Sequence, residues 1–199
     1  MTKDVEPQPQ LRVARLLTEL LQPVLVTCVL LLVIAVYAGG AVRGTLTGLV
    51  AVLFTGVIPY GFLVLRMRGG RVGDRHVRRR QERPVVLGFG VASLVAGLLV
   101  LTLLGAPREL FALLAAIAAT TAVALGVTFL WKISIHAACV AGSVAALGVV
   151  FGPVGLLSLP AVAAVGWSRV ALGDHTTAQV VAGSLLGFAA GGAVQLTLR

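Results

Sequence analysis

The sequence predicts an all-α membrane protein, a bundle of six to seven transmembrane helices. Hydrophobic residues make up 58% of the 199 residues and charged residues only 12%, whereas soluble domains are about 45–50% apolar and roughly 25% charged. The mean hydropathy is +1.02. Apolar stretches long enough to cross a bilayer, roughly 20 residues in a helix, recur along the chain. These observations exclude both a soluble domain and a disordered chain.

The apolar stretches give the predicted helices in chain order. The first four spans run from Leu16 or Pro23 to Tyr37, from Thr45 to Leu65, from Val85 to Ala106 and from Leu110 to Trp131. A tract from Ile133 to Trp167 follows, and because Gly152-Pro153 interrupts it, we expect two short helices that meet there. The last span runs from about Thr176 to Leu198. Seven helices result, or six if the pair around Gly152 forms a hairpin that does not fully cross.

One transmembrane domain is expected over residues 16–199, after a polar N-terminal segment of residues 1–15. No cleavable signal peptide is expected, because the first twenty residues are polar. The loop of residues 66–84 is rich in arginine and poor in acidic residues. Positive charge in short loops stays in the cytoplasm. The loop and the N-terminal segment are therefore predicted to face the cytoplasm, from the cell inner or plasma membrane.

The three histidines are all predicted at the cytoplasmic ends of helices. His76 lies in the basic loop, His136 at the start of the fifth helix and His175 at the start of the last. Ionisable groups at membrane depth are costly and usually functional. Each histidine has cations nearby in the sequence: Arg75 and Arg83, Lys132, and Arg169 respectively. Guanidinium groups match phosphate oxygens and imidazole can attack phosphorus, so we expect an anion site. The same charge would repel a metal ion, so no metal or cofactor is expected.

Three short patterns around these histidines resemble the motifs of the type 2 phosphatidic acid phosphatase superfamily, which read K-x6-R-P, P-S-G-H and S-R-x5-H-x3-D. The third appears as Ser168-Arg169, five residues and then His175. The second keeps Ser134 and His136 but loses its proline and glycine, and the first keeps Arg83-Pro84 but has His76 at the lysine position.

The resemblance implies a metal-independent hydrolysis of a lipid or prenyl phosphate in two steps. His175 matches the nucleophile that forms a phosphohistidine, and His136 matches the acid that protonates the departing alkoxide and then activates water. The phosphoryl oxygens would be held by Arg83, Arg169 and Ser134, with further charge from His76, Arg75, Arg80 and Lys132.

The chief departure from the family is Gln179, which stands where the third motif has aspartate. Positions four apart share a helix face, so the Gln179 amide oxygen is predicted to accept the ring N–H of His175 and orient it. An amide has no negative charge to stabilise an imidazolium. Either Asp174 or Asp74 compensates through a tertiary contact, or the chemistry has changed.

Three functions remain open from the sequence. The leading one is the lipid or prenyl phosphate phosphatase, which would include a prenyl-linked phosphosugar as substrate. The second is an isoprenoid diphosphate lyase or cyclase, and the third is a non-catalytic lipid-phosphate-binding membrane protein. The expected partners are a lipid-tailed phosphate and membrane lipids, not nucleic acid.

Small residues recur in the last helix. Gly183, Gly187 and Gly191 form two overlapping small-xxx-small steps, a pattern typical of close helix packing in membranes. A contact between copies of a homo-oligomer is the alternative use of this face.

Overall fold

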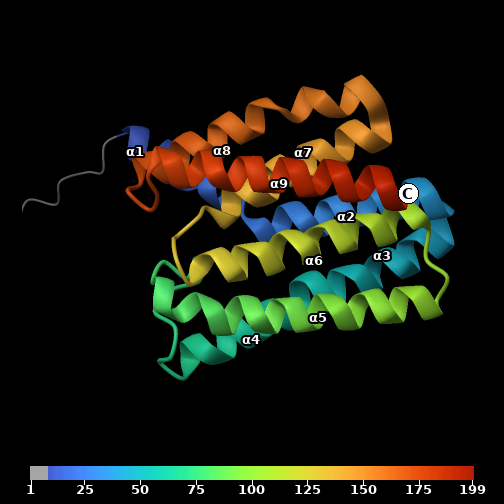
Figure 1. Ribbon diagram of the computed structural model, residues 1–199, viewed down its shortest axis with the longest axis horizontal. Coiled ribbons are helices and arrows are strands. Elements are labelled where there is room, and N and C mark those ends of the chain that lie inside the picture. The colour runs from blue at the N-terminus through green and yellow to red at the C-terminus, as the bar shows by residue number, and fades with distance from the viewer. Residues whose placement is uncertain (1–8) are drawn as a thin grey trace, which may run out of the picture.

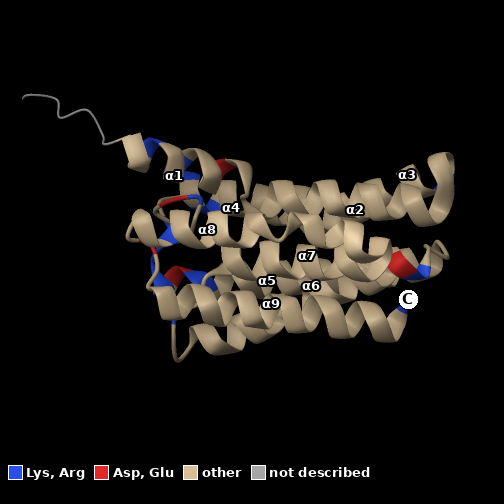
Figure 2. Cartoon of the chain, turned by 90° about the horizontal axis from the view of Figure 1, so that it is seen from above, with Lys and Arg blue, Asp and Glu red and all other residues tan. Residues whose placement is uncertain are grey.

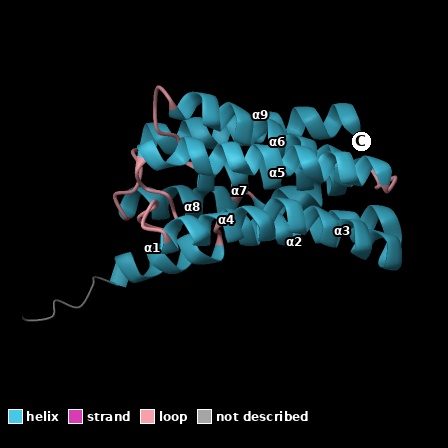
Figure 3. Cartoon of the chain, turned by 90° about the horizontal axis from the view of Figure 1, so that it is seen from below, coloured by secondary structure: helices cyan, strands magenta, loops and turns pink. Residues whose placement is uncertain are grey.

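The computed structural model describes residues 9–199, which form helices and no strand (Figure 1). Residues 1–8 of the predicted N-terminal segment lie outside the described residues. The α-helices are α1 (Pro9–Leu20), α2 (Pro23–Gly39), α3 (Thr45–Val52), α4 (Ile58–Arg68), α5 (Arg83–Leu103), α6 (Arg108–Thr128), α7 (Ile135–Phe151), α8 (Pro160–Ala171) and α9 (Thr177–Leu198). From α2 onward they lie lengthwise, and the loops gather at the two ends of the bundle (Figure 3).

The helices fit a multi-pass membrane protein. In the described part of the chain, five helical segments are long and apolar enough to cross a membrane: Pro23–Arg68, Arg80–Leu103, Arg108–Thr128, Ile135–Ser158 and Thr177–Leu198. This count of five is lower than the six to seven spans that the sequence predicts. One reason is that the first segment, 46 residues long, contains two of the predicted spans. The other is that α8, with 12 residues, is too short to be counted alone.

The first long segment reverses direction at two glycines. Gly40 ends α2 with a φ of 74°, a left-handed conformation that favours glycine. A π-helical turn (Gly40–Gly44) then leads into α3, which packs against α2. At Gly44 a Cβ would come within 2.3 Å of the Ala35 carbonyl oxygen, so only glycine permits this close approach. A second π-helical turn (Leu53–Val57) joins α3 to α4.

The hydrophobic core lies between α2, α3, α5, α6 and α7, toward the end of the bundle where α5 passes to α6. Its buried members are Leu30, Leu31, Ile34, Ala35, Ala51, Leu94, Leu101, Leu110, Leu113, Leu114 and Ala146. Large apolar side chains also cover the outside of the helices; in α2 they include Leu25, Val29 and Val33. An apolar outer surface of this kind is typical of contact with lipid.

Glycines bring α7 and α9 into close contact. A Cβ at Gly187 would come within 1.9 Å of the Ala138 carbonyl oxygen, and the Cβ atoms of Gly183 and Gly191 would meet carbonyl oxygens at 2.4 and 2.5 Å. The prediction of close helix packing is confirmed. The partner is α7 of the same chain, so this glycine face is already covered within one molecule. The contact also aligns the starts of α7 and α9.

Positive charge gathers at one end of the bundle, around α1, the end of α4 and the end of α8 (Figure 2). The helices extend further into the predicted basic loop than expected, because α4 continues to Arg68 and α5 begins at Arg83. The segment between them is residues 69–79 followed by a 3₁₀ turn, Arg80–Glu82. We call the end of the bundle that carries this segment the basic end.

Candidate functional site

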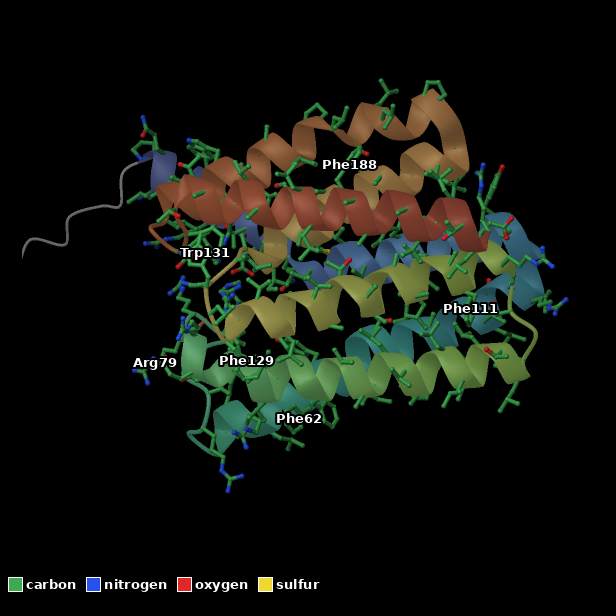
Figure 4. The ribbon with its side chains drawn as sticks, in the orientation of Figure 1. Phe62, Arg79, Phe111, Phe129, Trp131 and Phe188 are labelled. Carbon is green, nitrogen blue, oxygen red and sulfur yellow. The ribbon has the colours of Figure 1, made fainter. Side chains whose placement is uncertain are left out.

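The three predicted histidines meet at the basic end of the bundle, where Figure 4 shows charged side chains crowded near Trp131 and Arg79. His136 lies in the first turn of α7 and His175 lies between α8 and α9. His76 comes from the segment between α4 and α5, and its ring centroid is 5.4 Å from that of His136. His136 and His175 are close enough to interact electrostatically.

Arg169, near the end of α8, is the centre of this cluster. Its side chain is 1% exposed, and its charge acts on each of the three histidines. Nη2 lies 2.9 Å from Asp174 Oδ2. The Nε and Nη1 atoms are buried without a hydrogen-bond partner. Buried donors are almost always paired, so the two unpaired guanidinium donors are an exception that calls for a partner.

Arg83, the first residue of α5, is fixed by two carbonyl groups. Its Nε donates to the Val77 oxygen at 3.0 Å, and its Nη1 donates to the Ile133 oxygen at 2.9 Å. Val77 has a φ of 46°, a strained conformation for a β-branched residue. Arg83 therefore ties the turn at Val77 to the start of α7 and brings a second buried positive charge to the cluster.

The predicted contact between His175 and Gln179 is present, with Nδ1 3.0 Å from Oε1. The same oxygen accepts from the Thr176 backbone N–H at 3.2 Å, as part of a capping box at the start of α9. This oxygen is therefore the acceptor, so Nδ1 of His175 carries the proton and Nε2 has the free lone pair. Burial, then the positive charges of Lys132 and Arg83, lowers the pKa of His175 to about 3. The imidazole is neutral at pH 7.

Neither aspartate that could have replaced the family's carboxylate contacts His175 with its side chain. Asp174 pairs with Arg169 and, at 2.8 Å, with Arg78 Nε. Its backbone carbonyl accepts from Lys132 Nζ at 2.7 Å. Asp74 accepts from the backbone N–H groups of His76 and Arg78. Both carboxylates thus stabilise the surrounding loops.

Sequence reasoning missed Glu19, the one acidic residue of α1. Its Oε1 lies 3.3 Å from His76 Nε2 and 2.6 Å from Arg75 Nη2. Arg75 therefore holds a carboxylate and not a free anion site. The only signal in the sequence is a single acidic residue in an otherwise basic amphipathic segment, and nothing in that pattern identifies its partner.

Two predicted phosphate-binding residues have structural partners. Arg80 is exposed, and its Nη1 donates to the Leu130 carbonyl at 2.8 Å. Ser134 is fully buried, and its Oγ accepts from the Ala137 N–H at 3.3 Å as the cap of α7. Its backbone N–H donates to the Gln179 carbonyl at 3.1 Å, which joins the starts of α7 and α9. Arg80 stands outside the cluster, whereas Ser134 lies within it.

A cavity of about 260 Å³ opens beside the histidines and runs into the bundle. Its polar end is formed by Arg75, His76, Arg83 and His136. The rest of its wall is mainly apolar and comes from α2, α4, α5, α6, α7 and one residue of α9; it includes Leu30, Leu63, Leu94, Leu113, Ile117 and Gly142. From Arg83 to Leu94, eleven residues along α5, the wall extends about 16 Å. His175 and Arg169 do not line it.

Within residues 9–199, no group of three histidine, cysteine, aspartate or glutamate side chains is placed to hold a metal ion. The cluster is instead dominated by cations.

No family model, no curated protein and no solved structure matches the chain.

Proposed function

We propose that this protein is a multi-pass membrane phosphatase that hydrolyses the phosphate ester of a lipid-tailed substrate. One observation carries the proposal. A buried guanidinium with two unpartnered donors, Arg169, interacts with all three histidines, and two of these, His76 and His136, line an apolar cavity. An oxyanion bound to Arg169 would satisfy these donors, and charge-assisted bonds of this kind are strong in a dry site.

His175 is the proposed nucleophile. Its Nε2 lone pair attacks phosphorus and the bond from phosphorus to the lipid oxygen breaks. His136, protonated while the phosphate dianion is bound, gives its proton to the departing alkoxide and becomes neutral. Water then attacks the phosphohistidine, and the bond to His175 breaks with the electron pair returning to nitrogen. Arg169 and Arg83 stabilise the charge on the phosphoryl oxygens throughout. The Gln179 contact supports this role, because it holds the ring in the tautomer whose free nitrogen can attack.

The cavity supports a substrate with a single apolar tail beside an anionic head. A tail lying against Leu94 and Leu113 would place its phosphate at the end formed by Arg83 and His136. The substrate class is a monophosphate or diphosphate of a lipid or prenyl alcohol, a prenyl-linked phosphosugar included.

In the proposed topology the chain crosses the membrane seven times. The two limbs of Pro23–Arg68 count as two passes, and α8, extended by the 3₁₀ segment Gly152–Ser158, counts as one. The basic end then faces the cytoplasm by the distribution of positive charge, and the membrane is the cell inner or plasma membrane. The site would act on the inner leaflet.

The experiment is phosphate release by purified protein in detergent with a chelator present. The substrates are farnesyl phosphate, phosphatidate and lysophosphatidate. Wild type should release phosphate from at least one, and His175→Asn should release none. Arg80→Gln, which removes an exposed cation outside the cluster, is the matched control and should retain activity. Activity that persists in His175→Asn, or that requires a divalent cation, contradicts the mechanism.

A non-catalytic phospholipid-binding protein is the second candidate, because His175 is held by an amide that also caps α9. It predicts that at least one of the three lipid phosphates binds without any turnover, and that His136→Ala leaves this binding unchanged. Product analysis on the same samples decides between the two functions.

A further inference from the structure

Helix α1 is docked so that it delivers an acidic side chain to the histidine cluster. It packs on α8, and Thr18 Oγ1 donates to Ser168 Oγ at 3.1 Å in a buried contact. Ser168 directly precedes Arg169. Glu19, the residue after Thr18, is thereby brought to His76, 57 positions away in the sequence.

The contact between Glu19 and His76 fixes the protons on that ring. A carboxylate only accepts, so the Nε2 of His76, 3.3 Å from Glu19 Oε1, carries the proton and Nδ1 has the lone pair. Among the three histidines of the described chain, His76 alone contacts a carboxylate. The Nε2 of His136 is buried without a partner, and His175 is bound to an amide.

The two steps of the proposed reaction place different demands on these rings. The nucleophile must be neutral before it attacks, and an amide suffices to orient it. The group that takes a proton from water becomes an imidazolium, and a carboxylate stabilises that cation. His175 is held by an amide, whereas the carboxylate of Glu19 contacts His76. A carboxylate at His76 would stabilise the imidazolium that forms when this ring takes a proton from water.

We propose that His76 is the general base of the second step and that Glu19 is its positioning residue. This rests on the proposed phosphatase function. As the water oxygen bonds to phosphorus and the phosphorus–nitrogen bond to His175 breaks, the water proton passes to His76 Nδ1. His76 then returns a proton to His136, whose ring centroid is 5.4 Å away. This replaces the proton that His136 gave to the alkoxide, so the cycle closes without any other reactant.

The electrostatic setting of His76 agrees with this role. The charged and titratable groups around it are Glu19 from α1, Asp74 and Arg75 from its own segment, His136 from α7 and Arg169 from α8. Burial and the Arg169 charge lower the pKa of His76 below 6.5, and Glu19 raises it. The ring is therefore neutral at pH 7 and can accept a proton.

The test measures the phosphoenzyme as well as turnover. Wild type, Glu19→Gln and His76→Asn are given the ³²P-labelled lipid phosphate that wild type hydrolyses fastest among the three above. Both variants should lose about 10²–10⁴ in kcat, the usual contribution of general acid–base catalysis, and KM should fall with kcat, because kcat/KM is set by the unaffected first step. Because only the second step is blocked, labelled phosphoenzyme should accumulate in both. Glu82→Gln, which removes a carboxylate at the same end without touching a histidine, is the matched control and should behave as wild type.

The pH profile gives a second readout that a merely structural role would not move. Turnover should rise with pH as the His76 base loses its proton. In Glu19→Gln this acidic limb should move to lower pH, because the carboxylate that raised the pKa of His76 is gone. If Glu19→Gln does not fold, phosphoenzyme accumulation in His76→Asn decides the question.

The outcomes separate the two proposals. If wild type releases phosphate and forms phosphoenzyme, but Glu19→Gln and His76→Asn match Glu82→Gln, the acid–base pair is overturned and the phosphatase stands. If wild type neither releases phosphate nor forms phosphoenzyme, both proposals fail.

Discussion

Single residues decide whether the basic end of the bundle can bind an anion. Arg169 and Arg83 are both almost fully buried, at 1% and 4% exposure. Arg83 uses two donors on carbonyl groups, whereas Arg169 leaves two donors unused beside its ion pair with Asp174. A buried cation with unused donors is costly unless an anion completes it, so Arg169 is the residue on which phosphate binding should depend most.

Replacing Arg169 by glutamine should lower kcat/KM for the lipid phosphate by about 10²–10³, the effect of losing one donor to a developing oxyanion. Arg169→Lys should recover part of this loss, because it keeps the charge but not the planar donor set. The measurement is phosphate release in the presence of a chelator. Arg80→Gln, the same chemical change at an arginine outside the cluster, is the control. Equal activities in Arg169→Gln and Arg80→Gln would contradict the assignment.

The depressed pKa of His175 predicts a dependence of stability on pH. In the folded protein this pKa is about 3, against an ordinary value of 6.5. Below pH 6.5 the unfolded chain gains a proton at this position that the folded protein does not, so stability falls as pH is lowered from 6.5 toward 3. The melting temperature of His175→Asn in detergent should therefore fall less steeply over this window than that of wild type. Parallel curves for the two proteins would show that His175 is not held neutral.

At the scale of elements, the site depends on how closely α7 and α9 approach. The backbone bond from Ser134 to Gln179 and the capping box of α9 join the two helix starts. Gly183, Gly187 and Gly191 of α9 allow the two helix backbones to approach closely along this interface. Helix α1 also helps to build the site. Its packing on α8 brings Glu19 to His76.

Gly187→Ala should destabilise the protein by about 1–3 kcal/mol, the usual cost of overpacking, because its Cβ would meet the Ala138 carbonyl oxygen at 1.9 Å. Gly192→Ala is the matched control, since its Cβ would lie 3.9 Å from the nearest atom, an ordinary contact. Thermal unfolding followed by the fluorescence of Trp131 and Trp167 compares the two. A melting temperature for Gly187→Ala as high as that of Gly192→Ala would contradict the packing role.

At the scale of the whole molecule, the cavity leads from the basic end to the core, and Leu30, Leu94 and Leu113 belong to both. Core residues such as Leu101 and Leu110 lie near the turn from α5 to α6, whereas the polar end of the cavity lies at the basic end. The bundle is therefore packed at one end and open to a ligand at the other. This division suits a protein that takes a lipid tail from the bilayer while its charged head stays at the membrane surface.

The proposed topology predicts opposite accessibility for the two ends. In a chain whose Cys28 and Cys139 are replaced by alanine, single cysteines are introduced at Arg71 and Leu104. A membrane-impermeant thiol reagent should label Arg71→Cys in inside-out vesicles and Leu104→Cys in intact spheroplasts. Labelling of both from one side would contradict the seven-pass arrangement, and a reversed pattern would place the basic end outside.

The sequence by itself determined the long apolar helices, the charged end and the presence of the three histidines there, but not the separate helix α1. It could do so because a bilayer requires long apolar helices and because helix ends follow local signals such as Pro23, Pro84 and Gly152. The contact of His175 with Gln179 was predictable for the same reason, since it spans four residues of one chain segment.

Only the tertiary structure decided the partners that lie far apart in the sequence. The pairing of Glu19 with His76 and the unused donors of Arg169 both depend on how helices pack. Helix packing is set by the shapes of whole faces and by backbone approach, and no local pattern encodes which residue will meet which. The same holds for the cavity, whose wall is assembled from six helices.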